Sequence, residues 1–172
     1  MKEEHKIAQG EIKSFLTFRL EKEQFAVNVT DVIEILVVPK ITKVPRAPEY
    51  LVGVINLRGN VLPVIDTRIK FNMTPTILTE ETCIVVMNIE IDEEEIVVGA
   101  LVDAVYQVID IEEKAIKASP SIGSDYNPEF IEGVIKIGEE FVMLLDIGKV
   151  FSSKEMTVLT EASNMNIKNE TK

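Results

Sequence analysis

Residues 48–71 read PEYLVGVINLRGNVLPVIDTRIKF, and residues 128–151 read PEFIEGVIKIGEEFVMLLDIGKVF. The two segments align without a gap, and seven of their 24 positions are identical. Most of the other positions match one apolar residue with another. Such internal similarity is typical of a protein built from two copies of one unit.

The identical positions of this repeat predict its structural framework. They are Pro48/Pro128, Glu49/Glu129, Gly53/Gly133, Val54/Val134, Ile55/Ile135, Asp66/Asp146 and Phe71/Phe151. The unshared part is Asn56-Leu57-Arg58-Gly59, which aligns with Lys136-Ile137-Gly138-Glu139. A duplicated scaffold acquires a one-sided binding site where its copies differ, so such a site is expected in this unshared part.

Composition bounds the class of protein. The 172 residues suffice for one domain or two small packed halves. The net charge of −11 argues against binding to nucleic acid or to an anionic membrane surface. No apolar stretch reaches the ~20 residues of a membrane span, and the polar N-terminus lacks the apolar core of a signal peptide. A cytoplasmic protein is therefore expected.

Alternating and β-branched runs predict short strands along most of the chain. We expect strands at 12–20, 25–29, 32–38, 41–44, 52–57 and 61–71, and again at 83–89 and 96–102. One helical turn is expected at 48–51, because Pro and Glu stand in its first turn. The chain becomes polar after Ser152, which predicts a short helix at 154–162 and disorder in the last ten residues.

Many short strands with turns between them favour a barrel or a sandwich. Residues 28–33 and 100–105 also match weakly, at an offset of 72, which extends the repeat. We therefore expect an all-β fold of two halves, approximately 12–75 and 82–150. Helical periodicity is almost absent, which disfavours folds with parallel sheets.

Few residues are suited to catalysis or metal binding. The one histidine, His5, lies in the polar lead-in, which excludes a Ser-His-Asp triad and a His-rich metal site. Cys83 lies in an apolar run that is typical of a buried strand thiol. The acidic run 90–95 is typical of a solvated turn, because adjacent carboxylates repel and lack the spacing of a calcium loop. No catalytic residue, metal or cofactor is predicted.

One enzymatic alternative remains. Asp66 and Asp146 each follow an apolar strand, as the two carboxylates of aspartic proteases do. Those enzymes need Asp-Thr/Ser-Gly in both halves, whereas this chain has Asp-Thr-Arg and Asp-Ile-Gly. The competing interpretation is that each Asp caps a strand end or a short helix.

Arg58 and Glu34 are the charged residues whose positions are unusual. Arg58 stands at a turn and has no basic counterpart in the second copy. Arginine is favoured in protein interfaces, although an isolated surface arginine is the commoner case. Glu34 interrupts the apolar run 32–38, so it either faces solvent or has a partner. A pair between the two would require neighbouring strands.

The stretch LVGVINLRGNVLPVIDTRIKF closely resembles the signature of the CheW family of bacterial chemotaxis coupling proteins. The V-x-E-I run at 32–35 and the ending LLDIGKVFS extend the resemblance to approximately residues 10–153. The resemblance implies two five-stranded SH3-like β-barrels around a shared apolar seam. It leaves residues 1–9 as a flexible lead-in and 154–172 as a polar tail without a family role.

By the same resemblance, the chain is a non-enzymatic adaptor that joins the helical cytoplasmic tips of chemoreceptors to the regulatory domain of the histidine kinase CheA. It would then be recruited to membrane receptor arrays through its partners. The implied receptor-binding residues are Val32, Glu34, Asn56 and Arg58, and the implied kinase-binding residues are Ile41 and Val44. Two alternatives stay open: a regulatory module of a larger protein of the CheA or CheV type, and, more distantly, an aspartic hydrolase using Asp66 and Asp146.

Overall fold

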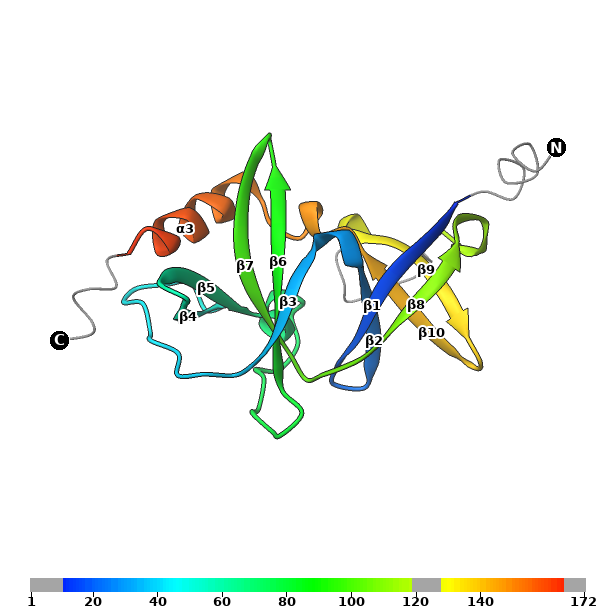
Figure 1. Ribbon diagram of the computed structural model, residues 1–172, viewed down its shortest axis with the longest axis horizontal. Helices are drawn as coiled ribbons and strands as arrows, with labels where there is room; N and C mark the ends of the chain where they lie inside the picture. The colour runs from blue at the N-terminus through cyan, green and yellow to red at the C-terminus, as the bar shows by residue number, and fades with distance from the viewer. Residues whose placement is uncertain (1–10, 119–127, 166–172) are drawn as a thin grey trace.

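Ten short strands make up most of the regular structure in a computed structural model that describes residues 11–118 and 128–165 (Figure 1). The strands are β1 (Ile12–Leu20), β2 (Glu23–Asn28), β3 (Val32–Val37), β4 (Leu51–Leu57), β5 (Asn60–Asp66), β6 (Cys83–Ile91), β7 (Glu94–Val102), β8 (Ala104–Glu112), β9 (Ile131–Ile137) and β10 (Glu140–Leu145). The helical elements are α2 (Thr67–Lys70), α3 (Ser153–Ser163) and the 3₁₀ turns η1 (Val29–Asp31), η2 (Glu113–Ala115), η3 (Pro128–Phe130) and η4 (Ile147–Lys149). The all-β prediction is confirmed.

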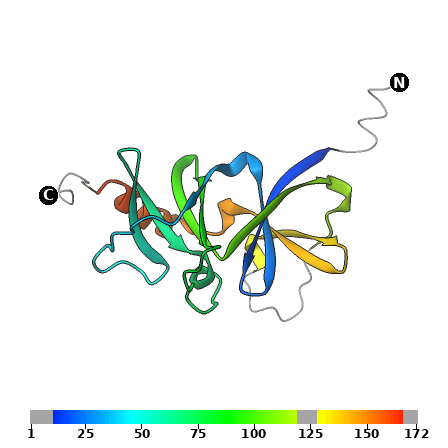
Figure 2. The ribbon, with the colours of Figure 1, turned by 60° about the horizontal axis from the view of Figure 1, so that its bottom comes forward.

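The strands form two five-stranded sheets that lie side by side (Figure 2). The first sheet has the order β8-β1-β2-β10-β9, and the second has the order β3-β6-β7-β5-β4. The second sheet is one continuous segment, 32–102, while the first is built from the segments that flank it. The sheets therefore do not follow the expected halves, 12–75 and 82–150, because each half of the sequence repeat gives strands to both sheets.

Because strands of the two copies are exchanged between the sheets, two of the strand pairs are parallel, which the sequence did not predict. β2 and β10 run parallel, and so do β5 and β7. Each parallel pair joins a strand from the first copy of the repeat to a strand from the second. The low helical periodicity therefore did not exclude parallel pairing, because no helix is needed to connect strands that come from different copies.

Each sheet is closed into a barrel by the segment that follows one of its edge strands. After β3 the chain turns back, and Thr42 exchanges two backbone hydrogen bonds of 2.8 Å with Val54 on β4. After β8, Lys117 exchanges bonds of 2.9 and 2.8 Å with Val134 on β9. The strand expected at 41–44 is thus only this isolated bridge.

The two closures explain why the repeat keeps a glycine before the bridged valine. A Cβ on Gly53 would lie 2.2 Å from the Thr42 carbonyl oxygen. A Cβ on Gly133 would lie 2.8 Å from the Lys117 carbonyl oxygen and closer still to the Ile116 side chain. Both glycines therefore provide the space that lets the bridging backbone approach the edge strand.

The largest apolar cluster, here called the seam core, lies between the two sheets. Its members include Phe18, Phe25, Val85, Met87, Val98, Phe71, Phe130 and Phe151. Phe71 packs on Phe130 with ring centroids 4.7 Å apart, and Tyr50 packs on Phe151 at 6.3 Å. Each contact joins one copy of the repeat to the other, since Tyr50 aligns with Phe130 and Phe71 with Phe151.

Tyr50 carries a hydroxyl that its counterpart Phe130 lacks. The hydroxyl is buried and has no hydrogen-bond partner among the described residues. Burial, and then the charge of Glu155, raise the pKa of Tyr50 to about 12. We expect Tyr50→Phe to leave the free energy of unfolding unchanged or to raise it by up to about 1 kcal/mol, because it removes an unsatisfied polar atom. Urea denaturation measures this change, and a loss of stability would show that the hydroxyl has a partner in solution.

Helix caps account for the shared aspartates and for the end of β5. The Asp66 carboxylate accepts hydrogen bonds from the Arg68 and Ile69 amides at the start of α2, so the strand expected at 61–71 stops at Asp66. The Asp146 carboxylate accepts from the Gly148 amide in η4. The capping interpretation of both residues is confirmed.

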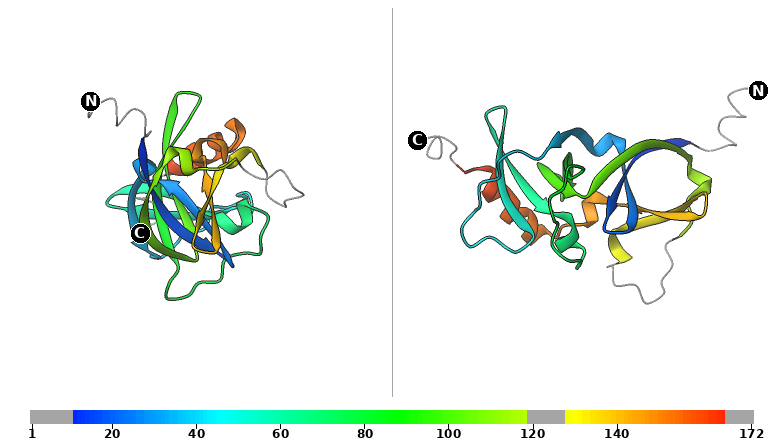
Figure 3. Two further views of the ribbon diagram at one scale, coloured as in Figure 1. Left: turned by 90° about the vertical axis from the view of Figure 1, so that its right-hand side faces the viewer. Right: turned by 90° about the horizontal axis from the view of Figure 1, so that it is seen from below.

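The expected C-terminal helix is present as α3. Ser152 and Glu155 form a capping box at its start. Met156, Leu159 and Ala162 are buried against the second sheet, where α3 lies next to β5 and β7 (Figure 3). Part of the polar tail is therefore integral to the fold. Residues 1–10, 119–127 and 166–172 lie outside the described residues, and with them the expected flexible lead-in at 1–9.

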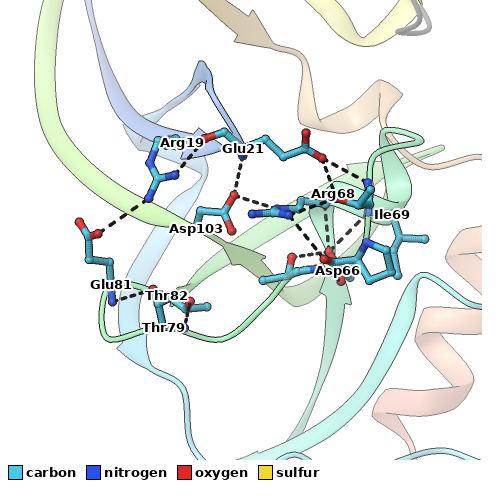
Figure 4. A network of polar contacts seen from close by, with 12 residues as sticks. Arg19, Glu21, Asp66, Arg68, Ile69, Thr79, Glu81, Thr82 and Asp103 are labelled. Carbon is cyan, nitrogen blue, oxygen red and sulfur yellow. Dashed lines mark hydrogen bonds and ion pairs between the residues drawn. The ribbon is translucent and has the colours of Figure 1, made fainter.

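A polar network crosses the seam between the sheets (Figure 4). Asp103 lies at the junction of β7 and β8, where its carboxylate accepts from Arg68 Nε at 2.8 Å and from the Glu21 amide at 2.5 Å. Asp66 accepts from the Thr76 hydroxyl at 2.7 Å and from the Thr76 amide at 2.9 Å. The network joins α2 in the second sheet's half to the β1–β2 turn of the first sheet.

Candidate functional site

The β4–β5 hairpin presents Arg58 at its tip. Leu57 pairs with Asn60, so the turn contains only Arg58 and Gly59. Both have positive φ, 50° and 87°, as in a type I′ turn. Asn56 supports the turn, because its side-chain oxygen accepts a hydrogen bond from the Gly59 amide at 2.8 Å. In the second copy only the first turn residue, Gly138, has positive φ.

Glu34 reaches Arg58 from the other edge of the same sheet. Arg58 Nη1 donates to Glu34 Oε1 at 3.3 Å, and Nη2 donates to the second carboxylate oxygen, which makes the pair bidentate. β3 and β4 are not hydrogen-bonded neighbours, since they lie at opposite edges of the second sheet. The curl of the barrel, rather than strand pairing, brings the two side chains onto one surface.

The pair is ionised and accessible to solvent. Its side chains are 68% exposed for Arg58 and 27% exposed for Glu34. The hydrogen bond from Arg58 lowers the pKa of Glu34, and the same bond raises the pKa of Arg58. Because an exposed pair contributes little to stability, its main consequence is to hold the guanidinium in a defined position.

An apolar strip accompanies this pair and was not singled out from the sequence. Ile33, Ile35 and Val37 on β3 are 51, 44 and 87% exposed. They alternate with Glu34 along the strand, so they point to the opposite side of it. The alternation of residues in 32–38 could have indicated a strand with one exposed face, but an apolar run of this kind is equally typical of a buried strand. Exposed apolar residues on an edge strand indicate a protein-binding surface.

A second edge strand carries the same kind of surface. β8, at the edge of the first sheet, exposes Tyr106 and Val108 by 48 and 56%. β3 and β8 each follow a strand of the other sheet, and both occupy the same place in their barrels. Apolar side chains are therefore exposed on both sides of the boundary between the sheets.

Three of the residues implied by the family resemblance point inward. Val32 is partly buried against the seam core. Ile41 and Val44 are partly buried too, against the second barrel's interior and the seam core respectively. The exposed residues in and around this segment include Lys40, Lys43 and Arg46.

The remaining chemically distinctive groups have structural partners. The Cys83 thiol donates to the Glu81 carbonyl at 3.2 Å, and burial raises its pKa. Among the described residues, no three His, Cys, Asp or Glu side chains are grouped to hold a metal ion. No helix in the same part of the chain is both long and apolar enough to cross a membrane.

The chain is similar to chemotaxis proteins over most of its length. The family model of the CheW-like domain matches residues 14–155. A probable chemotaxis protein CheW of Rhizobium etli is 35% identical over 147 residues, which cover 86% of this chain and 92% of that protein. The chemotaxis protein CheW of Klebsiella aerogenes is 32% identical over 147 residues, covering 86% of each.

A solved structure agrees with this similarity. The crystal structure of the scaffolding protein TtCheW from Thermoanaerobacter tengcongensis superposes with a TM-score of 0.72 at 30% sequence identity. The match covers 83% of this chain and 89% of that one. The two curled five-stranded sheets are thus the two SH3-like barrels that the family resemblance implies.

Proposed function

Because the chain belongs to the CheW-like domain family, we propose that it is a chemotaxis scaffold that couples the helical tips of chemoreceptors to the histidine kinase CheA. It acts by binding both partners and not by catalysis. A change in receptor state then alters kinase activity only through contacts that differ between the two states. In this role the chain reaches membrane receptor arrays through its partners.

The observation that carries this proposal is the pairing of Arg58 with Glu34 beside the exposed apolar strand β3. A receptor tip is an amphipathic helical hairpin, and a groove or strip that accepts such a helix offers apolar contacts with polar groups at the margin. Arg58 supplies a fixed cation, and Ile33 and Ile35, on the other side of the edge strand β3, supply apolar contacts to a helix that lies along this edge. The second copy of the repeat has neither the arginine nor its turn.

We expect Arg58→Ala to weaken binding to a receptor cytoplasmic fragment by roughly tenfold or more, as for an arginine that anchors an interface. The fold should persist, because Arg58 is 68% exposed and alanine at the same φ suffers a similar backbone strain. Co-sedimentation with the fragment measures binding, and circular dichroism checks the fold.

Lys136→Ala is the matched control, since Lys136 is an exposed cation in the equivalent hairpin of the second copy. It should reduce receptor binding by much less. Equal losses in the two variants, or unchanged binding of Arg58→Ala, would remove Arg58 from the receptor surface. Failure of the unaltered chain to bind either receptor or CheA would overturn the adaptor function itself.

A further inference from the structure

Asn56 makes a hydrogen bond to the turn that carries Arg58. Arg58 has a φ of 50°, a left-handed conformation that is unfavourable for a residue with a side chain. The strand pair ends at Leu57 and Asn60, so the Gly59 amide inside the turn has no strand partner. The Asn56 side-chain oxygen accepts a hydrogen bond from that amide at 2.8 Å. Asn56 therefore stabilises the turn in which Arg58 is strained.

The second copy of the repeat lacks both the strained side chain and the acceptor. Its turn has Gly138 at the position of Arg58, and glycine adopts a φ of 63° without steric cost. Lys136 stands at the position of Asn56, and its ammonium group can only donate hydrogen bonds. The acceptor is thus found in the copy whose turn must hold a side chain in a left-handed conformation.

Another hairpin of the protein forms a similar turn without such an acceptor. The two residues of the β6–β7 turn, Asp92 and Glu93, both have positive φ. Among the described residues, no side chain accepts a hydrogen bond from the Glu93 amide, which corresponds to the amide of Gly59. Asn56 should therefore be dispensable for folding, and its hydrogen bond acts mainly on the side chain that the turn carries.

The position of the Arg58 guanidinium depends on this turn. Glu34 lies on β3, at the opposite edge of the sheet from β4, so the ion pair joins two elements that are not hydrogen-bonded to each other. A change in the turn backbone is amplified at the end of the long arginine side chain. The pair cannot hold the turn by itself, because an exposed ion pair contributes little free energy. A hydrogen bond that fixes the turn backbone therefore helps to keep Arg58 on Glu34.

We propose that Asn56 is a positioning residue whose side-chain oxygen fixes the turn, so that Arg58 stays paired with Glu34 on the binding surface. This inference rests on the proposed function, and it replaces the direct receptor contact that the family resemblance implies for Asn56. A positioning residue acts only through Arg58, whereas a contact residue adds binding energy of its own. A double-mutant cycle separates the two roles.

The first measurement uses the full-length chain without a partner. The pKa of Glu34 is followed by NMR of its carboxyl carbon, because the hydrogen bond from Arg58 lowers this pKa. We expect Asn56→Ala to raise the Glu34 pKa toward the ordinary value of a glutamate, in the same direction as Arg58→Ala. Asn60→Ala is the matched control, since Asn60 is an exposed asparagine beside the same turn whose side chain makes no hydrogen bond among the described residues.

Three results of this measurement would overturn the positioning role. The first is a Glu34 pKa that is unchanged in Asn56→Ala, and the second is an equal rise in Asn60→Ala. The third is loss of the fold in Asn56→Ala, detected by circular dichroism, because the hydrogen bond would then serve folding and not the placement of Arg58.

The second measurement is the affinity for a receptor cytoplasmic fragment. We expect Asn56→Ala to weaken binding about fivefold, as the loss of one side-chain hydrogen bond does, and Asn60→Ala to leave it unchanged. In a chain that already carries Arg58→Ala, Asn56→Ala should have no further effect. Additive losses would show that Asn56 contacts the receptor directly. If the unaltered chain does not bind the fragment, the proposed function fails, while the Glu34 pKa still decides whether Asn56 positions Arg58.

Discussion

Asp103→Ala is expected to lower the free energy of unfolding by about 3–5 kcal/mol, as when one partner of a buried ion pair is removed. The Asp103 and Arg68 side chains are only 5% and 13% exposed. Removing the carboxylate leaves the guanidinium buried without its counter-charge and leaves the Glu21 amide without its acceptor. The broken contacts lie between the two barrels, so both barrels should be destabilised together. Urea denaturation followed by circular dichroism measures the change.

A double-mutant cycle with Arg68→Ala separates the pair from its surroundings. The free energy of unfolding of the double variant should fall by much less than the sum of the decreases in the two single variants, because no unpaired charge remains. The surface pair of Lys114 with Glu112, at 3.3 Å and with side chains 68% and 48% exposed, is the control. Its removal should cost below about 1 kcal/mol. Comparable losses for the two pairs would mean that Asp103 is not effectively buried.

Gly53→Ala is the second change with a large expected effect. A methyl group there would meet the Thr42 carbonyl oxygen at 2.2 Å and the Ile41 side chain at 2.8 Å. Relief requires the bridging backbone to move away from β4, which breaks both hydrogen bonds between Thr42 and Val54. We expect a loss near the upper end of the ~1–3 kcal/mol that overpacking costs, since the obstacle is backbone and not a mobile side chain.

Gly59→Ala separates this steric effect from the general cost of replacing glycine. Nothing lies within 4 Å of a Cβ at Gly59, but its φ is 87°. The Gly59→Ala variant should lose about 1 kcal/mol of unfolding free energy from backbone strain alone. Gly133→Ala, at the equivalent closure of the first barrel, should resemble Gly53→Ala. If Gly53→Ala is no more destabilising than Gly59→Ala in chemical denaturation, close approach is not the reason for the shared glycine.

Much of the fold could be predicted from local patterns in the sequence. Alternating and β-branched runs predicted β1, β3 and β4 closely. The repeat identified Gly53, Asp66 and their counterparts as framework residues before their roles in closure and capping were visible. The exchange of strands between the copies could not be predicted. A fold in which each sheet is made from one copy would bury the same apolar residues as the fold in which each sheet takes strands from both copies. Chain connectivity across the seam, at η1 and Asp103, decides between them.

The charged pair of the candidate site could be predicted from the sequence, but the exposed apolar residues beside it could not. Arg58 stood out because the second copy lacks it, and Glu34 because it interrupts an apolar run. The exposure of Ile33, Ile35 and Val37 depends on β3 being an edge strand, which is a property of the sheet order and not of the local sequence. Ile41 and Val44 face inward for a similar reason, because the bridge at Thr42 sets which side chains of the segment point out.

The continuous second barrel and the divided first barrel have a consequence during synthesis on the ribosome. The second sheet needs only residues 32–102, so it can form while the rest of the chain is still being made. β2 must wait for β10, since Gln24 pairs with Val142 more than a hundred residues later. At ~5–20 residues per second, the β1–β2 hairpin spends several seconds or more without its neighbours. Its apolar face is then exposed, and we expect this hairpin to be where chaperones engage the nascent protein.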